Sequence, residues 1–143
     1  MEYISILKNL LIVLLIALKN NSYVANLNIP KIDLAEKLYA INSPYNNIAY
    51  NIAYHEESTI NNTIILGHSG TSHISFFENL RYLNIGDVIY CNNDEYIIDN
   101  TYRVLKTGSL DIIYDENRIT LTLITCLDND YQLVIVAYKK INA

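Results

Sequence analysis

The chain has 143 residues, of which 51% are hydrophobic and 17% are charged, and its formal net charge is −5. This length gives room for one domain with a single core, and the hydrophobic content excludes a disordered chain. The negative charge and the scattered lysines and arginines argue against a nucleic-acid-binding protein, because phosphate contacts need a basic face.

The first segment, residues 1–20, is mostly apolar. As a helix, its apolar part at 4–18 would be about 22 Å long, which is short against a hydrocarbon core of about 30 Å. It suits a signal-peptide core or a marginal membrane anchor. We favour a retained anchor, because Tyr23 stands where a cleavage site after Ala25 needs a small residue. An amphipathic helix lying on the domain is the alternative, since Lys8 interrupts the apolar run.

After a brief linker at 20–25, residues 26–143 are expected to form one domain. Eight segments rich in Ile, Val, Tyr and Thr alternate with clusters of Asn, Gly, Asp and Pro, which is typical of short strands. The expected strands cover 26–32, 37–41, 48–53, 63–66, 87–91, 96–105, 119–125 and 132–138. Ser75 and Glu78 fit a capping box and predict a short helix at 74–83. The pattern predicts an all-β fold, a closed or nearly closed barrel of about eight strands with one or two short helices, preceded by the hydrophobic helix.

Two of the expected strands end at a reactive side chain. His68 follows the run 63–66, and Cys126 follows the run 119–125. A thiol and an imidazole at neighbouring strand ends would form a nucleophile and proton-transfer pair if the two strands lie side by side. Free cysteine titrates near about 8.5 and histidine near about 6.5, so such a pair can share one proton around neutral pH.

Two structural alternatives stay open from the residues alone. Cys91 and Cys126 are enough for one disulfide in an exported domain. Cys126 could instead be a buried structural thiol beside a satisfied His68, because free cysteine is among the most buried residue types. A zinc site is disfavoured, since no two ligands have a typical spacing and the histidines are scattered at positions 55, 68 and 73.

The sequence resembles the sortase family, the cysteine transpeptidases of Gram-positive-type cell surfaces, over most of the chain after Asn26. Leu-Gly-His at 66–68 is similar to the segment that carries the family's catalytic histidine. Thr-Leu-Ile-Thr-Cys at 122–126 is similar to the Thr-Leu-x-Thr-Cys strand that carries the nucleophile. Further similar segments are the opening strand, the helix and the Gly-Asp strand entry of the family, at 28–32, 76–80 and 83–89.

One element departs from the family pattern. Sortases carry an arginine at the start of the final strand, where it supports the oxyanion or positions substrate. The segment 131–137 reads Tyr-Gln-Leu-Val-Ile-Val-Ala, so Gln132 stands where the resemblance implies the arginine. Glutamine still donates a hydrogen bond, but it brings no charge and cannot hold two oxygens as a guanidinium does. The expected consequence is a less efficient enzyme of the same kind.

The resemblance implies a transpeptidase that cleaves a Leu-Pro-x-Thr-Gly-like sorting signal. Cys126 would form a thioester with it, His68 would transfer protons, and Gln132 would orient the oxyanion. The residues expected to contact substrate are Gly67, Ser69 and Thr125. The implied partners are a secreted protein with a sorting signal and an amine of the cell wall or a pilin. The implied location is the cell membrane, with the catalytic domain on its extracellular face. The alternatives are a non-catalytic module that binds sorting peptides and a thiol hydrolase.

No cofactor and no metal are expected. Some sortases bind calcium in a loop that resembles one of two acidic segments here. These segments contain Asp111, Asp115 and Glu116 in one case and Asp128, Asn129 and Asp130 in the other. Neither has the twelve-residue ligand spacing of a calcium loop, so solvated loop charge is favoured.

Overall fold

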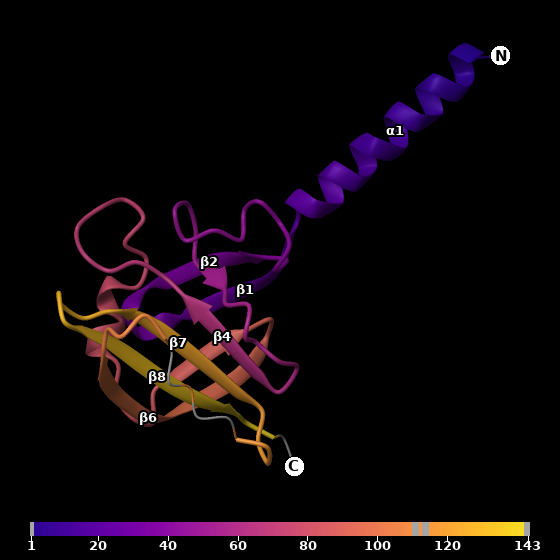
Figure 1. Cartoon of the computed structure of the whole chain (residues 1–143). Helices are drawn as coiled ribbons and strands as arrows, with labels where there is room; N and C mark the ends of the chain where they lie inside the picture. Colours follow the sequence, from indigo (N-terminus) through magenta and orange to yellow (C-terminus); the bar gives the residue numbers. More distant parts are fainter. Residues whose placement is uncertain (1, 110–111, 113–114, 142–143) are drawn as a thin grey trace.

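The computed structural model describes residues 2–109, 112 and 115–141, and it consists of a long helix followed by a β-barrel (Figure 1). The helix is α1 (Glu2–Asn21). The strands are β1 (Tyr23–Ile29), β2 (Leu34–Tyr39), β3 (Ala53–Tyr54), β4 (Asn62–Leu66), β5 (Val88–Cys91), β6 (Asp94–Leu105), β7 (Thr120–Cys126) and β8 (Tyr131–Lys139). Two short 3-10 helices, η1 (Pro30–Ile32) and η2 (Glu78–Tyr82), lie between strands. The predicted all-β barrel with a preceding helix is confirmed.

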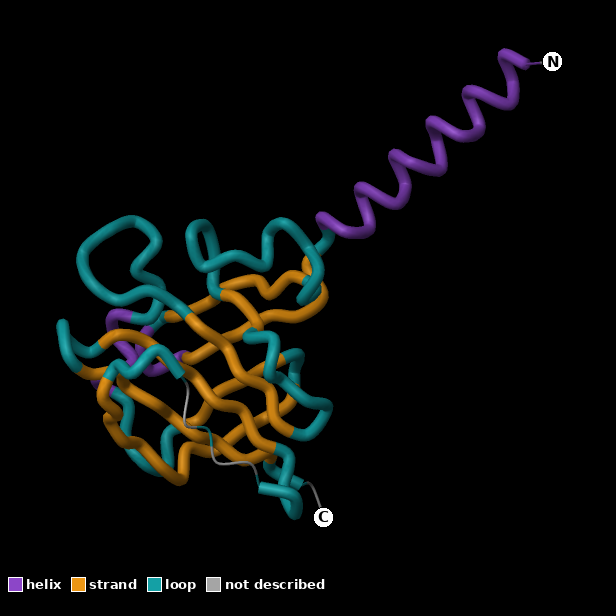
Figure 2. The backbone as a smooth tube through the Cα atoms, in the orientation of Figure 1, coloured by secondary structure: helices purple, strands orange, loops and turns teal. Residues whose placement is uncertain are grey.

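The eight strands form one sheet in the order β2-β1-β5-β6-β8-β7-β4-β3, which curls into a nearly closed barrel (Figure 2). All neighbouring strands are antiparallel except β4 and β7, which are parallel. The Asn46 side chain links the two ends of the sheet. Its carboxamide accepts from the Tyr54 N–H (2.7 Å) and donates to the carbonyls of Tyr54 (3.1 Å) and Ile41 (3.2 Å). These bonds satisfy the backbone N–H and carbonyl of Tyr54 at the edge of β3, and they link this edge to Ile41 in the chain that leaves β2.

Side chains that alternate along the strands fill the barrel interior. Leu27, Ile65, Leu123 and Ile135 are fully buried in this main core. A second, smaller cluster lies on the outer face of the sheet and consists of Ile64, Ile124 and Val134, against which Ile112 packs. β7 is therefore covered on both faces. This explains why its sequence is almost continuously buried and reads as an unbroken strand-like run.

α1 confirms the predicted N-terminal helix and corrects the idea that it lies on the domain. It projects away from the barrel in Figure 1. Leu10, Leu11, Ile12 and Val13 point in successive directions around the helix, and each is more than half exposed. No face of this segment is therefore covered by the barrel. Within the part of the chain that the structure describes, no helix combines the length and the apolar character that a membrane span needs.

The helix predicted at 74–83 is wrong in type and length, because the capping box does not form. The Glu78 carboxylate accepts a hydrogen bond from the Gly70 N–H (2.9 Å), and the Ser75 hydroxyl donates to the Ser69 carbonyl (3.0 Å). Both side chains hold the loop that follows β4, and the Glu78 N–H donates to the Ser75 carbonyl in place of the Ser75 hydroxyl. Only the 3-10 turn of η2 remains.

Several predicted strand boundaries are also corrected. The expected linker at 20–25 is absent, since α1 ends at Asn21 and β1 begins at Tyr23. Pro30 starts the 3-10 helix η1 and thereby ends β1, because proline fixes its own backbone angle and has no N–H to continue the ladder. The expected strand at 48–53 shrinks to β3. Asn47 accounts for this, since its side chain and carbonyl accept hydrogen bonds from the three following amides at 49, 50 and 51.

Candidate active site

The register of the parallel pair β4–β7 decides which side chains meet. Pairing begins at Asn62 with Thr120 and reaches Leu66 with Ile124. The Gly67 N–H donates to the Ile124 carbonyl (3.2 Å), so the pairing continues beyond β4. Partners are 58 residues apart, as in the contact of Thr125 with Gly67. The same offset puts His68 beside Cys126, because parallel partners advance together along the two strands.

The antiparallel pair β7–β8 adds a third polar side chain to this row. Cys126 is the direct partner of Gln132. Partners in adjacent strands share a face and lie on backbones about 4.8 Å apart. His68, Cys126 and Gln132 therefore form a row across three neighbouring strand ends, on the outer face of the barrel. We call these three residues the reactive row.

The reactive row stands at the edge of the outer apolar cluster. Ile124, two residues before Cys126, and Val134, two residues after Gln132, belong to that cluster, and Leu66, two residues before His68, packs against it. The members of the row are partly exposed, in contrast to Ile124 and Val134, which are buried. An apolar floor thus fixes the strand ends, and the side chains of the row remain partly accessible to solvent.

The sequence Gly67-His68 is held rigidly. The buried Thr125 hydroxyl donates to the Gly67 carbonyl (2.7 Å), and the Phe77 N–H donates to the His68 carbonyl (2.9 Å). A Cβ on Gly67 would stand 2.6 Å from the Phe77 ring, which is too close for any other residue without a shift of the buried ring. Ser69 follows directly, and its carbonyl accepts from the Ser75 hydroxyl.

The two thiols differ in their surroundings. Both are free, which rules out the disulfide alternative. Cys91 lies in the barrel core with 8% of its surface exposed. Burial, with a smaller contribution from the charge of Asp94, raises the pKa of the Cys91 thiol to about 11. Little Cys91 thiolate exists at neutral pH, whereas Cys126 is partly exposed at the end of β7.

Neither nearby arginine lies with the reactive row. Arg103 of β6 pairs with Leu133, which is one position from Gln132 and so on the opposite face of the sheet. Its guanidinium stacks over the Tyr131 ring at 4.6 Å. Arg118 precedes β7 and is held by Asp99 (2.6 Å) and Asp115 (2.8 Å). Neither guanidinium therefore lies among the side chains of the reactive row.

One cation at this end of the barrel was not singled out from the sequence. The Lys106 N–H donates to the Asp130 carbonyl (2.9 Å), and its ammonium donates to the Asp128 carbonyl (2.6 Å). No motif surrounds Lys106. Only the pairing of β6 with β8, which long-range contacts decide, brings it next to the turn that follows Cys126.

The acidic residues of this turn serve its backbone. The Asp128 carboxylate accepts from the N–H groups of Asp130 (2.9 Å) and Tyr131 (2.8 Å). These hydrogen bonds, more than the charges of Lys106 and Arg103, lower the pKa of Asp128. Asp128 is therefore a turn cap. Among the described side chains, no group of three or more His, Cys, Asp and Glu could hold a metal ion, and Asp111 lies outside the described residues.

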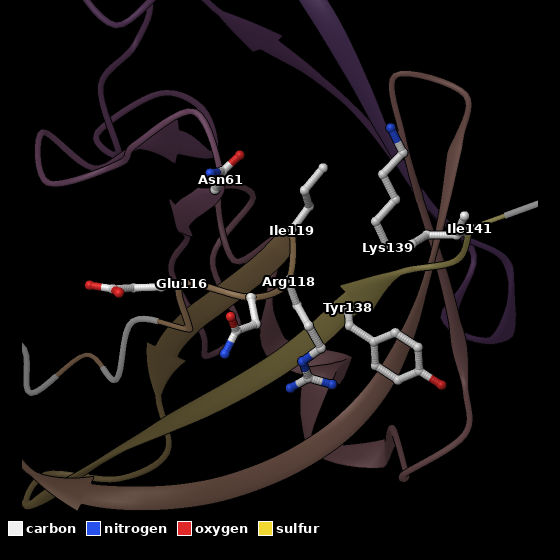
Figure 3. Close-up of a pocket in the computed structure, with 8 residues that line it drawn as sticks. Asn61, Glu116, Arg118, Ile119, Tyr138, Lys139 and Ile141 are labelled. Carbon is white, nitrogen blue, oxygen red and sulfur yellow. The ribbon is translucent and has the colours of Figure 1, made fainter.

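A separate pocket of about 450 Å³ lies where β7 begins and β8 ends, far along both strands from the reactive row (Figure 3). It is lined by Asn61, Glu116, Asn117, Arg118, Ile119, Tyr138, Lys139 and Ile141. Its size would admit a small ligand. It has no thiol or imidazole, however, and its cations are already paired, Arg118 as above and Lys139 with Asp94 (3.2 Å). This pocket therefore lacks the nucleophile and proton-transfer groups that the reactive row contains.

Comparison with known proteins gives consistent results. A family model of the sortase domain matches residues 27–140. Sortase A from Corynebacterium diphtheriae, a lid mutant, has a TM-score of 0.73 at 24% identity, over 85% of this chain and 72% of that chain. A sortase D5 transpeptidase from Clostridium perfringens has a TM-score of 0.71 at 21% identity, over 85% of this chain and 81% of that chain. Sortase A from Listeria monocytogenes has a TM-score of 0.69 at 19% identity, over 85% of this chain and 89% of that chain.

No curated protein matches the chain. The solved structures, at these identities, establish the fold. The family model spans most of the chain, including both reactive side chains, and it establishes the family. The chain therefore belongs to the sortase family, whose members are typically cysteine transpeptidases.

Proposed function

We propose that this protein is an active cysteine transpeptidase that cleaves a Leu-Pro-x-Thr-Gly-like sorting signal and transfers it to an amine of the cell wall or a pilin. The support for this proposal is the strand register: Cys126 is the direct partner of Gln132, and the offset of the β4–β7 pair, continued two residues past β4, puts His68 level with Cys126. A thiol nucleophile, a proton-transfer group and a hydrogen-bond donor are the minimum for acyl transfer.

In the first half of the reaction, the Cys126 thiolate attacks the carbonyl carbon of the Thr–Gly peptide bond. The C–S bond forms, and the carbonyl electron pair moves to oxygen, where the Gln132 amide can donate to it. The tetrahedral intermediate then collapses, the C–N bond breaks, and His68 gives its proton to the leaving amine. The product is a thioester on Cys126 and a neutral His68.

In the second half, neutral His68 takes a proton from the incoming amine, which attacks the thioester carbonyl. A new C–N bond forms, and the C–S bond breaks. The thiolate of Cys126 and the imidazolium of His68 are restored, so atoms and charges balance over the cycle.

Thr125, Gly67 and Ser69 support this chemistry in different ways. The Thr125 hydroxyl is used within the protein, on the Gly67 carbonyl, so we assign it a positioning role in place of direct substrate contact. It keeps His68 in register with Cys126. Gly67 allows the close approach of Phe77 beneath this turn. Ser69 is partly exposed next to His68 and is the residue of the three best suited to touch the peptide.

The proposal is tested with a sorting-signal peptide library and an added oligoglycine amine. We expect cleavage between Thr and Gly and a peptide–oligoglycine conjugate, and both should disappear in Cys126→Ala and His68→Ala. Mass spectrometry of the products separates the alternatives. Hydrolysed peptide without conjugate would identify a thiol hydrolase. Bound but uncleaved peptide would identify a non-catalytic binding module, the alternative that Gln132 favours.

The thiols should also differ in reactivity. Iodoacetamide at neutral pH should label Cys126 much faster than Cys91, because burial and the raised pKa keep Cys91 in its protonated form. Peptide mapping after timed labelling measures both rates. The Cys126→Ser variant should retain only the slow labelling of Cys91. Comparable rates at both cysteines would contradict the assignment of the nucleophile.

Replacement of Gln132 by arginine is predicted to increase the activity. Gln132→Arg should raise kcat about tenfold, or ~1.4 kcal/mol of transition-state stabilisation, because a charge-assisted donor is about twice as strong as a neutral one. Gln132→Ala should lower kcat, since the amide donor is lost. Steady-state kinetics with the cleaved peptide measure both variants. Unchanged kcat in both would mean that position 132 does not act on the reacting carbonyl.

For α1, the proposal is attachment of the enzyme to the membrane with the barrel on the extracellular face. Its support is the exposure of apolar side chains in all directions between Tyr3 and Leu14. Deleting residues 2–19 should move the protein from the membrane fraction to the soluble fraction, with peptide cleavage retained. Fractionation and the library assay check this. A truncated chain that stays in the membrane fraction, or that unfolds, would disprove the attachment role.

A further inference from the structure

We propose that Lys106 supplies the positive charge that the reactive row lacks at Gln132, and that its ammonium moves onto the oxyanion during acyl transfer. The catalytic part of this inference rests on the proposed function, whereas the presence of a mobile cation beside the thiol does not.

The strand register puts Lys106 on the face of the reactive row. Val104 of β6 is the direct partner of Gln132 in β8. The Lys106 N–H donates to the Asp130 carbonyl (2.9 Å), so the same ladder continues past the end of β6. Side chains two positions apart point to the same face of a strand. Lys106 therefore shares its face with Val104 and Gln132, and through Gln132 with Cys126.

The ammonium is within reach of the thiol. Its nitrogen lies 2.6 Å from the carbonyl oxygen of Asp128, which is two residues beyond Cys126. Two residues of chain span at most about 7 Å, so the ammonium is on the order of 10 Å from the Cys126 backbone. Lys106 is exposed, and rotation about its side-chain bonds can shorten this distance by several Å.

The ammonium of Lys106 is also in no ion pair. Among the described residues, no carboxylate lies within ion-pairing distance of its ammonium, while Lys31, Lys139 and Lys140 are each paired with a carboxylate. The Asp128 carboxylate accepts two backbone N–H groups at Oδ1, and the Lys106 ammonium donates to the neutral Asp128 carbonyl. A hydrogen bond to an anion is stronger than one to a neutral carbonyl, so exchange for an oxyanion is favourable.

This arrangement divides the role of an arginine between two residues. When the thiolate attacks, negative charge develops on the substrate oxygen. Gln132 donates a neutral hydrogen bond to it, and Lys106 leaves the Asp128 carbonyl and donates a charged one. Lys106 keeps its proton, and no bond to it is made or broken. The exposed Asp128 carbonyl regains a partner from water.

The charge itself can be measured without any turnover. The ratio of Cys126 labelling rates with anionic iodoacetate and neutral iodoacetamide reports the local potential at the thiol. Lys106→Gln should lower this ratio at least threefold, and Lys106→Arg should preserve it. Lys140→Gln, at the opposite end of β8, is the matched control for net charge and should leave the ratio unchanged. An unchanged ratio in Lys106→Gln would overturn the inference.

Turnover tests the catalytic part through a double-mutant cycle with Gln132. Lys106→Gln should lower kcat about tenfold in the natural sequence, but less than threefold in the Gln132→Arg background, because the guanidinium then supplies the charge. A lysine that only holds the turn through Asp128 would cost the same in both backgrounds, and that result would overturn the catalytic role. Circular dichroism of each variant checks that the barrel is folded.

The labelling experiment and the turnover experiment together also separate this inference from the proposed function. A Lys106-dependent labelling ratio in a protein that cleaves no peptide would disprove the transpeptidase and keep the cation at the thiol. Cleavage with amine transfer that is unaffected by Lys106→Gln in either background would keep the transpeptidase and disprove the role of Lys106.

Discussion

The parallel pairing of β4 with β7 is the constraint on which the site depends. A shift by one residue would turn His68 toward the barrel core while Cys126 still faced outward. Two buried side-chain hydrogen bonds hold the register, Thr120 to Asn62 at one end and Thr125 to Gly67 at the other. A slipped register would leave these buried polar groups unpaired, at a cost of about 1–3 kcal/mol for each group. The geometry of the reactive row is thus maintained by the same contacts that stabilise the fold.

Packing on both faces of β7 also restrains the ends of the strands, in addition to the hydrogen bonds that hold the register. The barrel core covers one face, and the outer cluster around Ile124 and Val134 covers the other. Packing from both sides restrains β7 against a twist that would re-aim Cys126, and Ile135 and Val134 hold β8 and Gln132 in the same way. Mobility at this site is consequently left to exposed side chains beyond the strands, such as Lys106.

The sequence predicted the parts of the site that local pattern determines. His68 and Cys126 each end an apolar run, so their place at strand ends followed from periodicity. The barrel interior was likewise predictable from alternation. The capping box failed because Glu78 and Ser75 make contacts across a loop, and the strand at 48–53 failed because Asn47 stabilises a turn. The position of Lys106 depends on pairing between β6 and β8, which no local motif encodes.

Dividing an arginine's role between Gln132 and Lys106 has an energetic consequence. A lysine side chain loses about 2 kcal/mol of rotamer entropy when it is fixed, whereas the planar guanidinium is pre-organised and loses less per hydrogen bond formed. In the resting protein, the Asp128 carbonyl already restrains the lysine near the site. Part of the ordering cost is therefore met before substrate binds. Because the ammonium contacts the substrate oxygen only once charge develops there, its interaction stabilises the transition state more than the bound substrate, and this difference is what raises a rate.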